Sequence, residues 1–476
     1  MHYTLRLSVM TVALVWIAGV SAQGQDSLPA PAAESAENVR LVGYHDLQGR
    51  TALQAVTQID SEGRTWAYVG HHDSFFDGEQ RHNPITGQME WNGTSILDVS
   101  DPANPTLVWH LPNEVSANSR SVSVVYDYQF DSSPPGRDYL IRNSEASDEL
   151  KFQIWDITSR DTDPSQISLV AEILGTPENS CGPGCGGRYL SRVHKGWWSP
   201  ETGLYYGAAR EPGFRQAILN IWDLKDPRNP QFVSRAWLEG MKDGEPEMHP
   251  SLGRWHHPIV DEENGRLYGG FRSSGDAAAW DISDPANPTL VWQYDTIPPG
   301  YSGPHTISPI VYESVPNYHG DQLPRTYALV TDETSMGKVY MFDITQERYP
   351  MPIATWRVPD TEFRDRGGRF GPHQHAERRN GELNRFEDKL AWVAYFNAGV
   401  RVLDISNPYR IEEVGFYLPT PNDNTHPMGE GQAIAIQTND VTLDHRGLAY
   451  ATDRAGTGLF ILEYTGPPAG ATESDR

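Results

Sequence analysis

Short apolar stretches that end in an acidic residue and a turn recur along most of the chain. Two copies read SILDVSDPANPTLVWHL and AAWDISDPANPTLVWQY, in which an apolar run reaches an Asp, passes a turn with Asn and Pro, and then resumes. Apolar runs of this length between turn residues predict β-strands rather than helices. The acids that mark the successive copies are Asp98, Asp156, Asp223, Asp281, Asp343, Asp404 and Glu463.

The spacing of these copies predicts the fold. Successive marker acids lie 58 to 67 residues apart, and each interval holds several short apolar runs. A repeat of about 60 residues built from short strands is typical of one propeller blade. Seven copies therefore predict an all-β protein, a seven-bladed β-propeller. The acids themselves are expected to be structural, because an Asp before a turn accepts hydrogen bonds from the backbone of that turn.

The ring is expected to close through the N-terminus. The last copy stops after Glu463 without an outer strand, whereas NVRLVGYHD, residues 38–46, resembles the strand PTLVWHL of the first copy. Pairing of this N-terminal strand with the last blade removes exposed sheet edges. The sequence therefore predicts one domain whose two ends meet in the same blade.

The repeat resembles that of the LVIVD-repeat propeller family. The residues that carry the resemblance are ILDVSDPANP, AWDISDPANP and VLDISNP, and it covers nearly the whole chain after the leader. The resemblance implies the propeller fold. It implies little about function, because these residues lie on outer strands and many members of the family have no assigned activity.

The N-terminus has the pattern of a sorting signal. Arg6 precedes the apolar run 7–20, and small residues before Gln23 offer a cleavage site. This pattern predicts a secretory signal peptide, too short for a membrane span, and hence a periplasmic or secreted protein. The next segment is rich in Pro, Ala and Ser, which predicts a flexible linker. The predicted segments are a signal peptide at 1–22, a linker at 23–38, the propeller at 39–465 and a polar tail at 466–476.

The charge of the chain limits its expected partners, and its cysteines indicate the redox compartment. Asp and Glu number 63 against 38 Lys and Arg, a formal charge of −25, and no basic patch stands out. Nucleic acid is therefore excluded as an expected partner. No later apolar run is long enough to cross a bilayer. The two cysteines, Cys181 and Cys185 in CGPGC, predict a small disulfide loop in an oxidising compartment, with metal ligation by thiolates as the alternative.

Histidines recur at one position of four consecutive repeats. Where the innermost strand of a blade should begin, these repeats read SRVHKGW, RWHHPIV, SGPHTIS and GPHQHAE. In a four-stranded blade this point and the end of the second strand lie on one face, beside the central channel. The imidazoles are therefore expected to converge at the mouth of the channel. They belong to His194, His256, His257, His305, His373 and His375.

Strand periodicity predicts which of these imidazoles face the channel. Residues two apart in a strand point the same way, about 7 Å apart. His373 and His375 should then both face the channel, whereas only one of His256 and His257 should; the match to the preceding repeat favours His256. A bound metal would satisfy several converging imidazoles; the alternative is hydrogen bonding to water and backbone alone. The expected ligands are His194, His256, His305, His373, His375, His71 and His72, the last two from the strand end YVGHHDS.

Charged residues at the ends of the second strands are candidates for catalysis. Carboxylates there can act as general bases or can orient imidazoles, although channel rims also carry charges without a function. The four candidates are Glu211, Arg272, Asp332 and Asp453.

Two functions are consistent with these features. The layout of one axial His per blade looks like that of the carotenoid oxygenase propellers, which hold iron with four His. It also distantly resembles the selenium-binding protein and methanethiol oxidase propellers, through the pair His71 and His72 and a DISDP turn. These resemblances imply an exported metal-dependent oxidase, oxygenase or lyase acting on a small molecule, with copper or iron favoured and zinc as the third choice. The alternative is a non-catalytic propeller that binds a protein or glycan partner. Polar groups converging on the channel favour the enzyme.

Overall fold

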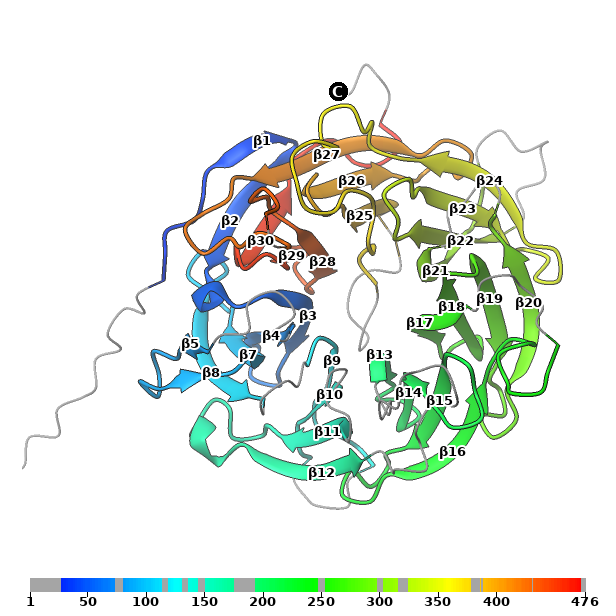
Figure 1. The fold of residues 1–476 in the computed structure, drawn as a ribbon, viewed down its shortest axis with the longest axis horizontal. Helices are drawn as coiled ribbons and strands as arrows, with labels where there is room; N and C mark the ends of the chain where they lie inside the picture. Colours follow the sequence, from blue (N-terminus) through cyan, green and yellow to red (C-terminus); the bar gives the residue numbers. More distant parts are fainter. Residues whose placement is uncertain are drawn as a thin grey trace, which may run out of the picture.

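The computed structural model is a ring of seven four-stranded antiparallel sheets around a central axis (Figure 1), which confirms the predicted seven-bladed propeller. No helix in the described part of the chain is long and apolar enough to span a membrane. The structure describes residues 27–72, 80–113, 119–130, 136–143, 150–174, 193–246, 253–297, 303–315, 324–377, 386, 388–429 and 431–471.

The first four blades follow one another along the chain, each built from the axis outward. Blade 1 consists of β3 (Ala52–Ile59), β4 (Thr65–His71), β7 (Gly93–Asp98) and β8 (Thr106–Pro112). Blade 2 consists of β9 (Val122–Val125), β10 (Tyr139–Asn143), β11 (Leu150–Asp156) and β12 (Ser168–Leu174). Blade 3 consists of β13 (Val193–Trp198), β14 (Leu204–Arg210), β15 (Ala217–Asp223) and β16 (Gln231–Ala236). Blade 4 consists of β17 (Arg254–Asp261), β18 (Arg266–Arg272), β19 (Asp276–Asp281) and β20 (Thr289–Asp295).

The last three blades include the two strands from the N-terminus. Blade 5 consists of β21 (Pro304–Tyr312), β22 (Arg325–Asp332), β23 (Val339–Asp343) and β24 (Met351–Trp356). Blade 6 consists of β25 (Leu390–Ala394), β26 (Val400–Asp404), β27 (Glu412–Pro419) and, outermost, β1 (Ala33–Glu37). Blade 7 consists of β28 (Thr438–Leu443), β29 (Ala449–Asp453), β30 (Leu459–Tyr464) and β2 (Val39–His45). A small hairpin, β5 (Arg81–His82) and β6 (Met89–Glu90), extends from blade 1.

The N-terminal segment joins two blades instead of one. Strand β2 pairs antiparallel with β30, with Leu41 opposite Leu462, as the sequence predicts. Strand β1 pairs with β27 on the outer edge of blade 6, so residues 33–37 are a strand and not part of a flexible linker. The edge of β27 offers unpaired backbone groups, and these hydrogen bonds outweigh the weak strand propensity of AESAE. Residues 1–22, the predicted signal peptide, lie outside the described residues.

The marker aspartates cap their turns, as predicted. Asp98 accepts a hydrogen bond from the backbone N–H of Ser100 at 2.8 Å, and Asp281 accepts one from that of Ser283 at 2.9 Å. Asp156, Asp223, Asp343 and Asp404 accept the corresponding bond in their own blades. Glu463 differs, because it forms an ion pair with Arg40 of the closing strand β2.

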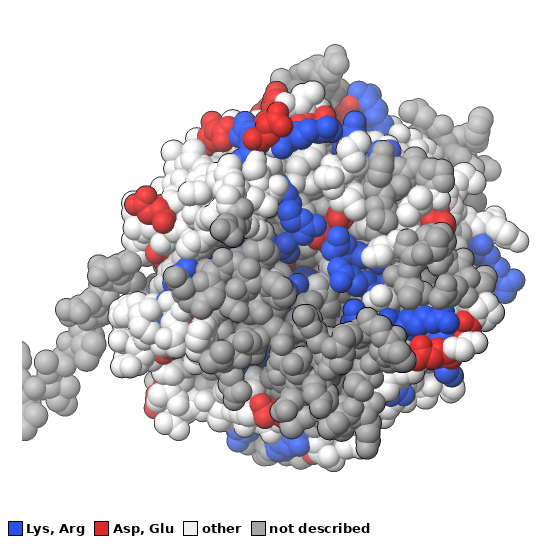
Figure 2. Space-filling view, in the orientation of Figure 1, with Lys and Arg blue, Asp and Glu red and all other residues white. Residues whose placement is uncertain are grey.

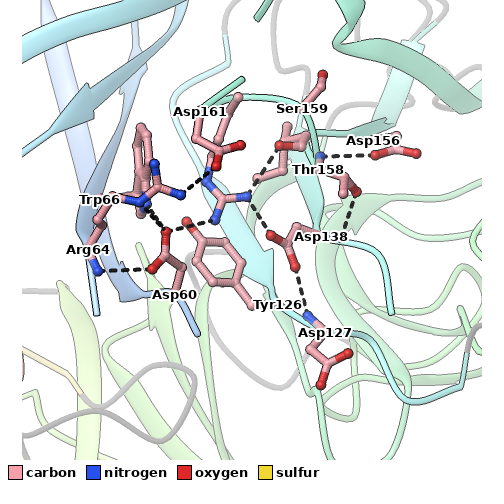
Figure 3. A network of polar contacts seen from close by, with 12 residues as sticks. Asp60, Arg64, Trp66, Tyr126, Asp127, Asp138, Asp156, Thr158, Ser159 and Asp161 are labelled. Carbon is pink, nitrogen blue, oxygen red and sulfur yellow. Dashed lines mark hydrogen bonds and ion pairs between the residues drawn. The ribbon is translucent and has the colours of Figure 1, made fainter. Parts of the chain in front are cut away.

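Polar contacts also tie neighbouring blades together on the face where the innermost strands end. Figure 3 shows such a network between blades 1 and 2. Arg160 lies over the rings of Trp66 at 4.9 Å and Tyr126 at 4.1 Å. Its guanidinium forms ion pairs with Asp138 at 2.5 Å and Asp60 at 3.7 Å. This buried arginine therefore links strands β3 and β10 away from the histidine-bearing strand starts.

The apolar core lies between adjacent blades. One cluster joins Ile221 of blade 3, Trp255 of blade 4 and Phe342 of blade 5, all buried. Because each blade packs a flat apolar face on the next, the innermost strands are held at fixed positions around the axis. The side chains at the starts of these strands are thereby set against one another.

Candidate functional site

Four histidines from four consecutive blades form a row at the mouth of the channel. His194, His256 and His305 lie in the first three residues of β13, β17 and β21, and His373 precedes β25. Adjacent ring centroids are 4.1 Å apart for His194 and His256, 4.2 Å for His256 and His305, and 4.3 Å for His305 and His373. The predicted convergence of these four imidazoles is therefore confirmed. We call this set the histidine row.

A β-bulge lies where three of these histidines, His194, His256 and His305, enter their strands. In β17, Trp255 pairs with Phe271 and Pro258 with Gly269, so two residues of β17 oppose one of β18. The innermost strands of blades 3 and 5 carry similar register shifts at His194 and His305. A bulge re-aims side chains that would otherwise alternate. The innermost strand of blade 6, which is not assigned as a strand, is held by hydrogen bonds to β25.

The bulge corrects the expectation that only one of the two histidines in RWHHPIV faces the channel. His256 joins the histidine row. His257 also points inward, because its Nε2 lies 3.0 Å from a carboxylate oxygen of Glu377 in blade 6. Beside it, Lys195 of blade 3 donates to Gln374 of blade 6 at 3.0 Å. These side chains are buried, so a layer of paired polar groups fills the channel beneath the histidine row.

Glu333 lies at the centre of the mouth. Its carboxylate is 2.9 Å from Arg272 and 2.6 Å from Arg369, and its exposed fraction is only 2%. The nearest Nε2 atoms are those of His256 at 3.6 Å, His373 at 3.8 Å and His305 at 4.0 Å. Sequence reasoning selected its neighbour Asp332, so this residue was missed. Arg272, predicted as a catalytic residue, lies at this position; its role stays a prediction.

His256, His305 and Glu333 have the spacing of a metal site. Their potential ligand atoms lie within 4.8 Å of one another, and all three residues are buried. Two donors about 2.1 Å from one ion lie about 3 to 4 Å apart, which matches the separations of these histidines from Glu333. The Nε2 of His305 has no hydrogen-bond partner in the described part of the chain, and the Glu333 oxygen 4.0 Å from it is the one that contacts Arg272 at 2.9 Å. A cation bound between His305 and Glu333 would give that nitrogen a partner.

The protonation states also fit a cation. Burial, followed by repulsion from neighbouring histidines, lowers the pKa of His256 and of His305 well below its ordinary value, so both imidazoles are uncharged at neutral pH. The Nε2 of His256 shares a hydrogen bond with that of His194 at 2.8 Å. Burial alone would raise the pKa of Glu333, but Arg272 and Arg369 outweigh it and hold that pKa well below the usual range. Neutral imidazoles with one ionised carboxylate are a donor set that transition metal ions take.

Two of the predicted ligands lie away from the row. His71 has its Nε2 hydrogen-bonded with the hydroxyl of Ser95 at 2.7 Å, inside blade 1. His375 is hydrogen-bonded with Ser308 at 2.8 Å and packs beside Phe386 between blades 5 and 6. The prediction that His375 faces the channel below His373 is therefore wrong, because the chain is irregular there and the two-residue period does not hold.

The remaining predicted ligand, His72, and the predicted catalytic residue Asp332 lie at the rim of the channel. His72 receives a hydrogen bond from Arg120 at its Nε2, at 2.6 Å, so that nitrogen is already occupied. Asp332 accepts a hydrogen bond from the hydroxyl of Thr334 at 3.1 Å and lies in the turn that presents Glu333. Neither side chain belongs to the group with metal-site spacing.

Two other predicted catalytic residues have structural partners. Glu211 accepts hydrogen bonds from Asn220 at 2.7 Å and Arg235 at 3.1 Å, both on the outer strands of blade 3. Asp453 accepts one from the backbone N–H of Ala455 at 2.8 Å and so caps the turn after β29. These contacts favour structural roles for both carboxylates. Cys181 and Cys185, and with them the predicted disulfide, lie outside the described residues.

Basic side chains surround the row. Figure 2 shows Lys and Arg gathered around the middle of the disc, on a molecule whose formal charge is −25. The arginines that act electrostatically on Glu333, His256 or one another here are Arg120, Arg254, Arg272, Arg369 and Arg454. The mouth of the channel is therefore a local region of positive charge.

The fold and the repeats define the class of protein to which this chain belongs: it is a seven-bladed β-propeller with a histidine row at the mouth of its channel. It carries LVIVD repeats, which the family model described as "LVIVD repeat" matches at residues 89–111, 280–296 and 387–418. These ranges include the three turns on which the resemblance was based. No curated protein matches the chain. The distant resemblances to metal-dependent propellers therefore stay hypotheses.

Several solved structures are similar to most of the chain. A protein from Lactobacillus plantarum shares 12% identity over 82% of this chain and 96% of its own, with a TM-score of 0.49. A putative 6-phosphogluconolactonase from Bacteroides uniformis shares 11% identity over 79% of this chain and 92% of its own, with a TM-score of 0.45. Sqt1 from Chaetomium thermophilum shares 9% identity over 92% of this chain and 99% of its own, with a TM-score of 0.48. None of these similarities assigns a function to this chain.

Proposed function

We propose that this protein is an exported metal-dependent enzyme whose channel mouth holds one transition metal ion and acts on a small molecule. His256, His305 and Glu333 are the core ligands, flanked by His194 and His373. The observation that carries the proposal is the buried Nε2 of His305, which has no hydrogen-bond partner in the described part of the chain and lies in a group with ligand spacing. An unpaired buried polar atom is costly, so its presence supports a bound ion.

The ligand set favours iron or copper, with zinc as the third choice, because imidazole suits all three ions. Such an ion supplies Lewis-acid or redox chemistry at an open coordination position. The chain itself contributes ligand orientation: Arg272 and Arg369 hold the Glu333 carboxylate, and their side chains are 22% and 35% exposed. The site is thus reached from solvent on the arginine side. Tight iron or copper binding would favour an oxidase or oxygenase, and a preference for zinc would favour a lyase.

Metal content per chain tests the proposal. The protein is purified without added metal, loaded separately with Fe²⁺, Cu²⁺ and Zn²⁺, freed of unbound ion and measured by elemental analysis. We expect close to one equivalent of the preferred ion, and its loss in His305→Ala and in Glu333→Gln. His445→Ala is the matched control, because His445 is exposed and lies in the turn between β28 and β29.

Two outcomes would contradict the proposal. One is wild-type protein that retains no metal under any loading; a non-catalytic propeller that binds a protein or glycan would then be the better hypothesis. The other is a His305→Ala variant that retains metal as tightly as the control. A folded state confirmed by circular dichroism keeps loss of metal from being mistaken for loss of structure.

A further inference from the structure

We propose that the same channel mouth binds its substrate through an oxyanion group, a carboxylate, sulfate or phosphate, and that Arg454 receives that group. The inference rests on the proposed function only for calling the ligand a substrate, because the anion site itself is built from arginines and needs no metal. It names a substrate class and a binding residue at the end of β29.

Arg454 is buried, and no carboxylate among the described residues forms an ion pair with it. Its exposed fraction is 7%, and its guanidinium forms no hydrogen bond or ion pair in the part of the chain that the structure describes. The other buried arginines of the described chain all have partners. Arg142, for example, donates to the carbonyl of Leu111 at 2.8 Å, and Arg160 pairs with Asp138 at 2.5 Å. A buried cation left unpaired costs several kcal/mol, which a bound anion would offset.

The surroundings of Arg454 add positive charge. Burial, followed by repulsion from Arg369, lowers the pKa of Arg454 to about 9, although attraction by Glu333 opposes this shift; Arg120 and Arg272 add to the repulsion. Glu333 already contacts Arg272 and Arg369. This one carboxylate therefore compensates two guanidinium groups directly, and no contact joins it to Arg454. The local excess of positive charge favours an anion.

Phe396 places this arginine beside the histidine row. The guanidinium of Arg454 lies 5.5 Å from the centre of the Phe396 ring, and that of Arg369 lies 4.3 Å from it. The ring of His373 lies 5.0 Å from the same phenylalanine. One aromatic ring thus contacts two arginines and the last imidazole of the row. An anion held by Arg454 would sit next to the proposed metal ligands and against an apolar surface.

The chemistry of the guanidinium selects the ligand class. Its planar N–H groups match the two oxygens of a carboxylate, sulfate or phosphate, and such bonds are among the strongest that side chains make. The rest of the molecule is strongly acidic and would repel anions. A positive opening on such a surface concentrates anions at that opening. We therefore infer a small anionic substrate, oriented with its oxyanion group toward Arg454.

Calorimetric titration of metal-free protein with simple probes tests the inference. The probes are propanoate, inorganic sulfate and inorganic phosphate, with propanamide as the uncharged analogue, all at one fixed chloride concentration. We expect one anion per chain, no binding of propanamide, and an affinity at least about tenfold weaker in Arg454→Gln. The matched control is Arg410→Gln, which removes the same charge from a side chain that is 74% exposed. The tightest of the three anions identifies the group that the substrate carries.

Thermal melting separates binding from structure. Since Arg454 is an unpaired buried cation, Arg454→Gln should melt at the same temperature as the wild type or higher in the absence of anion, and the preferred anion should raise only the wild-type melting temperature. Unchanged anion affinity in Arg454→Gln, or equal weak binding of all probes to both variants, would overturn the inference. Anion binding without metal binding would refute the proposed function alone, and metal binding without anion binding would refute this inference alone.

Discussion

Removing the charge of Glu333 while keeping its volume is the most informative single change. Glu333→Gln leaves Arg272 and Arg369 without the carboxylate that they contact at 2.9 and 2.6 Å. Breaking a fully buried pair costs about 3 to 5 kcal/mol, because the remaining charge is left uncompensated. The two arginine side chains are 22% and 35% exposed, so water screens part of that cost. We expect metal-free Glu333→Gln to lose about 2 kcal/mol of unfolding free energy.

A second substitution checks that this loss comes from the arginines. In Glu333→Gln/Arg272→Gln one of the two uncompensated cations is gone, so about half of the lost stability should return. Glu347→Gln is the control, because Glu347 pairs with Arg266 at 2.8 Å near the surface, where such a pair contributes about 1 kcal/mol or less.

Urea unfolding followed by tryptophan fluorescence measures both effects. Without metal, the curves give the loss of stability; with metal at about 1,000 times its dissociation constant, wild-type protein should gain about 4 kcal/mol and Glu333→Gln almost nothing. A metal-free Glu333→Gln that is more stable than the wild type would refute the view that the carboxylate compensates the arginines. An equal gain from metal in both proteins would refute its place among the ligands.

Three other predictions concern the scaffold around the site. Burial lowers the pKa of His71 to about 3, so the contribution of His71 to stability is complete above pH 6.5 and falls by about 1.4 kcal/mol per pH unit below that pH. His71→Gln should therefore make the urea midpoint of unfolding depend less steeply on pH below 6.5. An unchanged slope would contradict this prediction. Gly371 has φ +120°, and a Cβ there would lie 2.1 Å from the carbonyl oxygen of Thr334, in the turn that follows Glu333. Gly371→Ala should therefore weaken metal binding at least about tenfold in a competitive chelator titration, although it changes no ligand. Unchanged affinity would show that the Glu333 turn is free to shift. Arg160→Met should lower the free energy of unfolding in urea by about 3 kcal/mol but leave the metal content at the wild-type level. The reason is that the contacts of Arg160 lie at the opposite ends of the strands from the histidine row. Loss of metal would contradict that separation.

The repeats were enough to predict the fold, because each blade carries its own turn signal. Asp98 and Asp281 cap turns of the same kind, and any chain that repeats such a turn at blade spacing builds similar blades. The histidine row was predictable for the same reason, since equivalent positions in successive blades meet at the axis. Strand β1 was not predictable, because AESAE has no apolar pattern and is held by the edge that it finds on β27.

Glu333 and Arg454 were not selected from the sequence, and the reason is the same for both. Asp332 and Asp453 both end a second strand, and both were chosen from sequence for their charge. In the structure each accepts hydrogen bonds in the turn that follows, whereas the next residue, Glu333 or Arg454, points to the mouth. Period-two reasoning failed similarly at His257, because a bulge is a local change of register that leaves no mark in the apolar pattern.

The pairing of β1 and β2 with β27 and β30 sets an order on folding. These two strands are the first of the propeller to be synthesised, yet their partners are among the last, so neither sheet can be completed until nearly the whole chain is available. Until then the outer edges of blades 6 and 7 are open. Those blades also carry His373 and Arg454, so the loss of β1 and β2 would disturb the channel mouth from the far side of the same sheets. The integrity of these two strands therefore becomes a determinant of how many molecules reach a competent site.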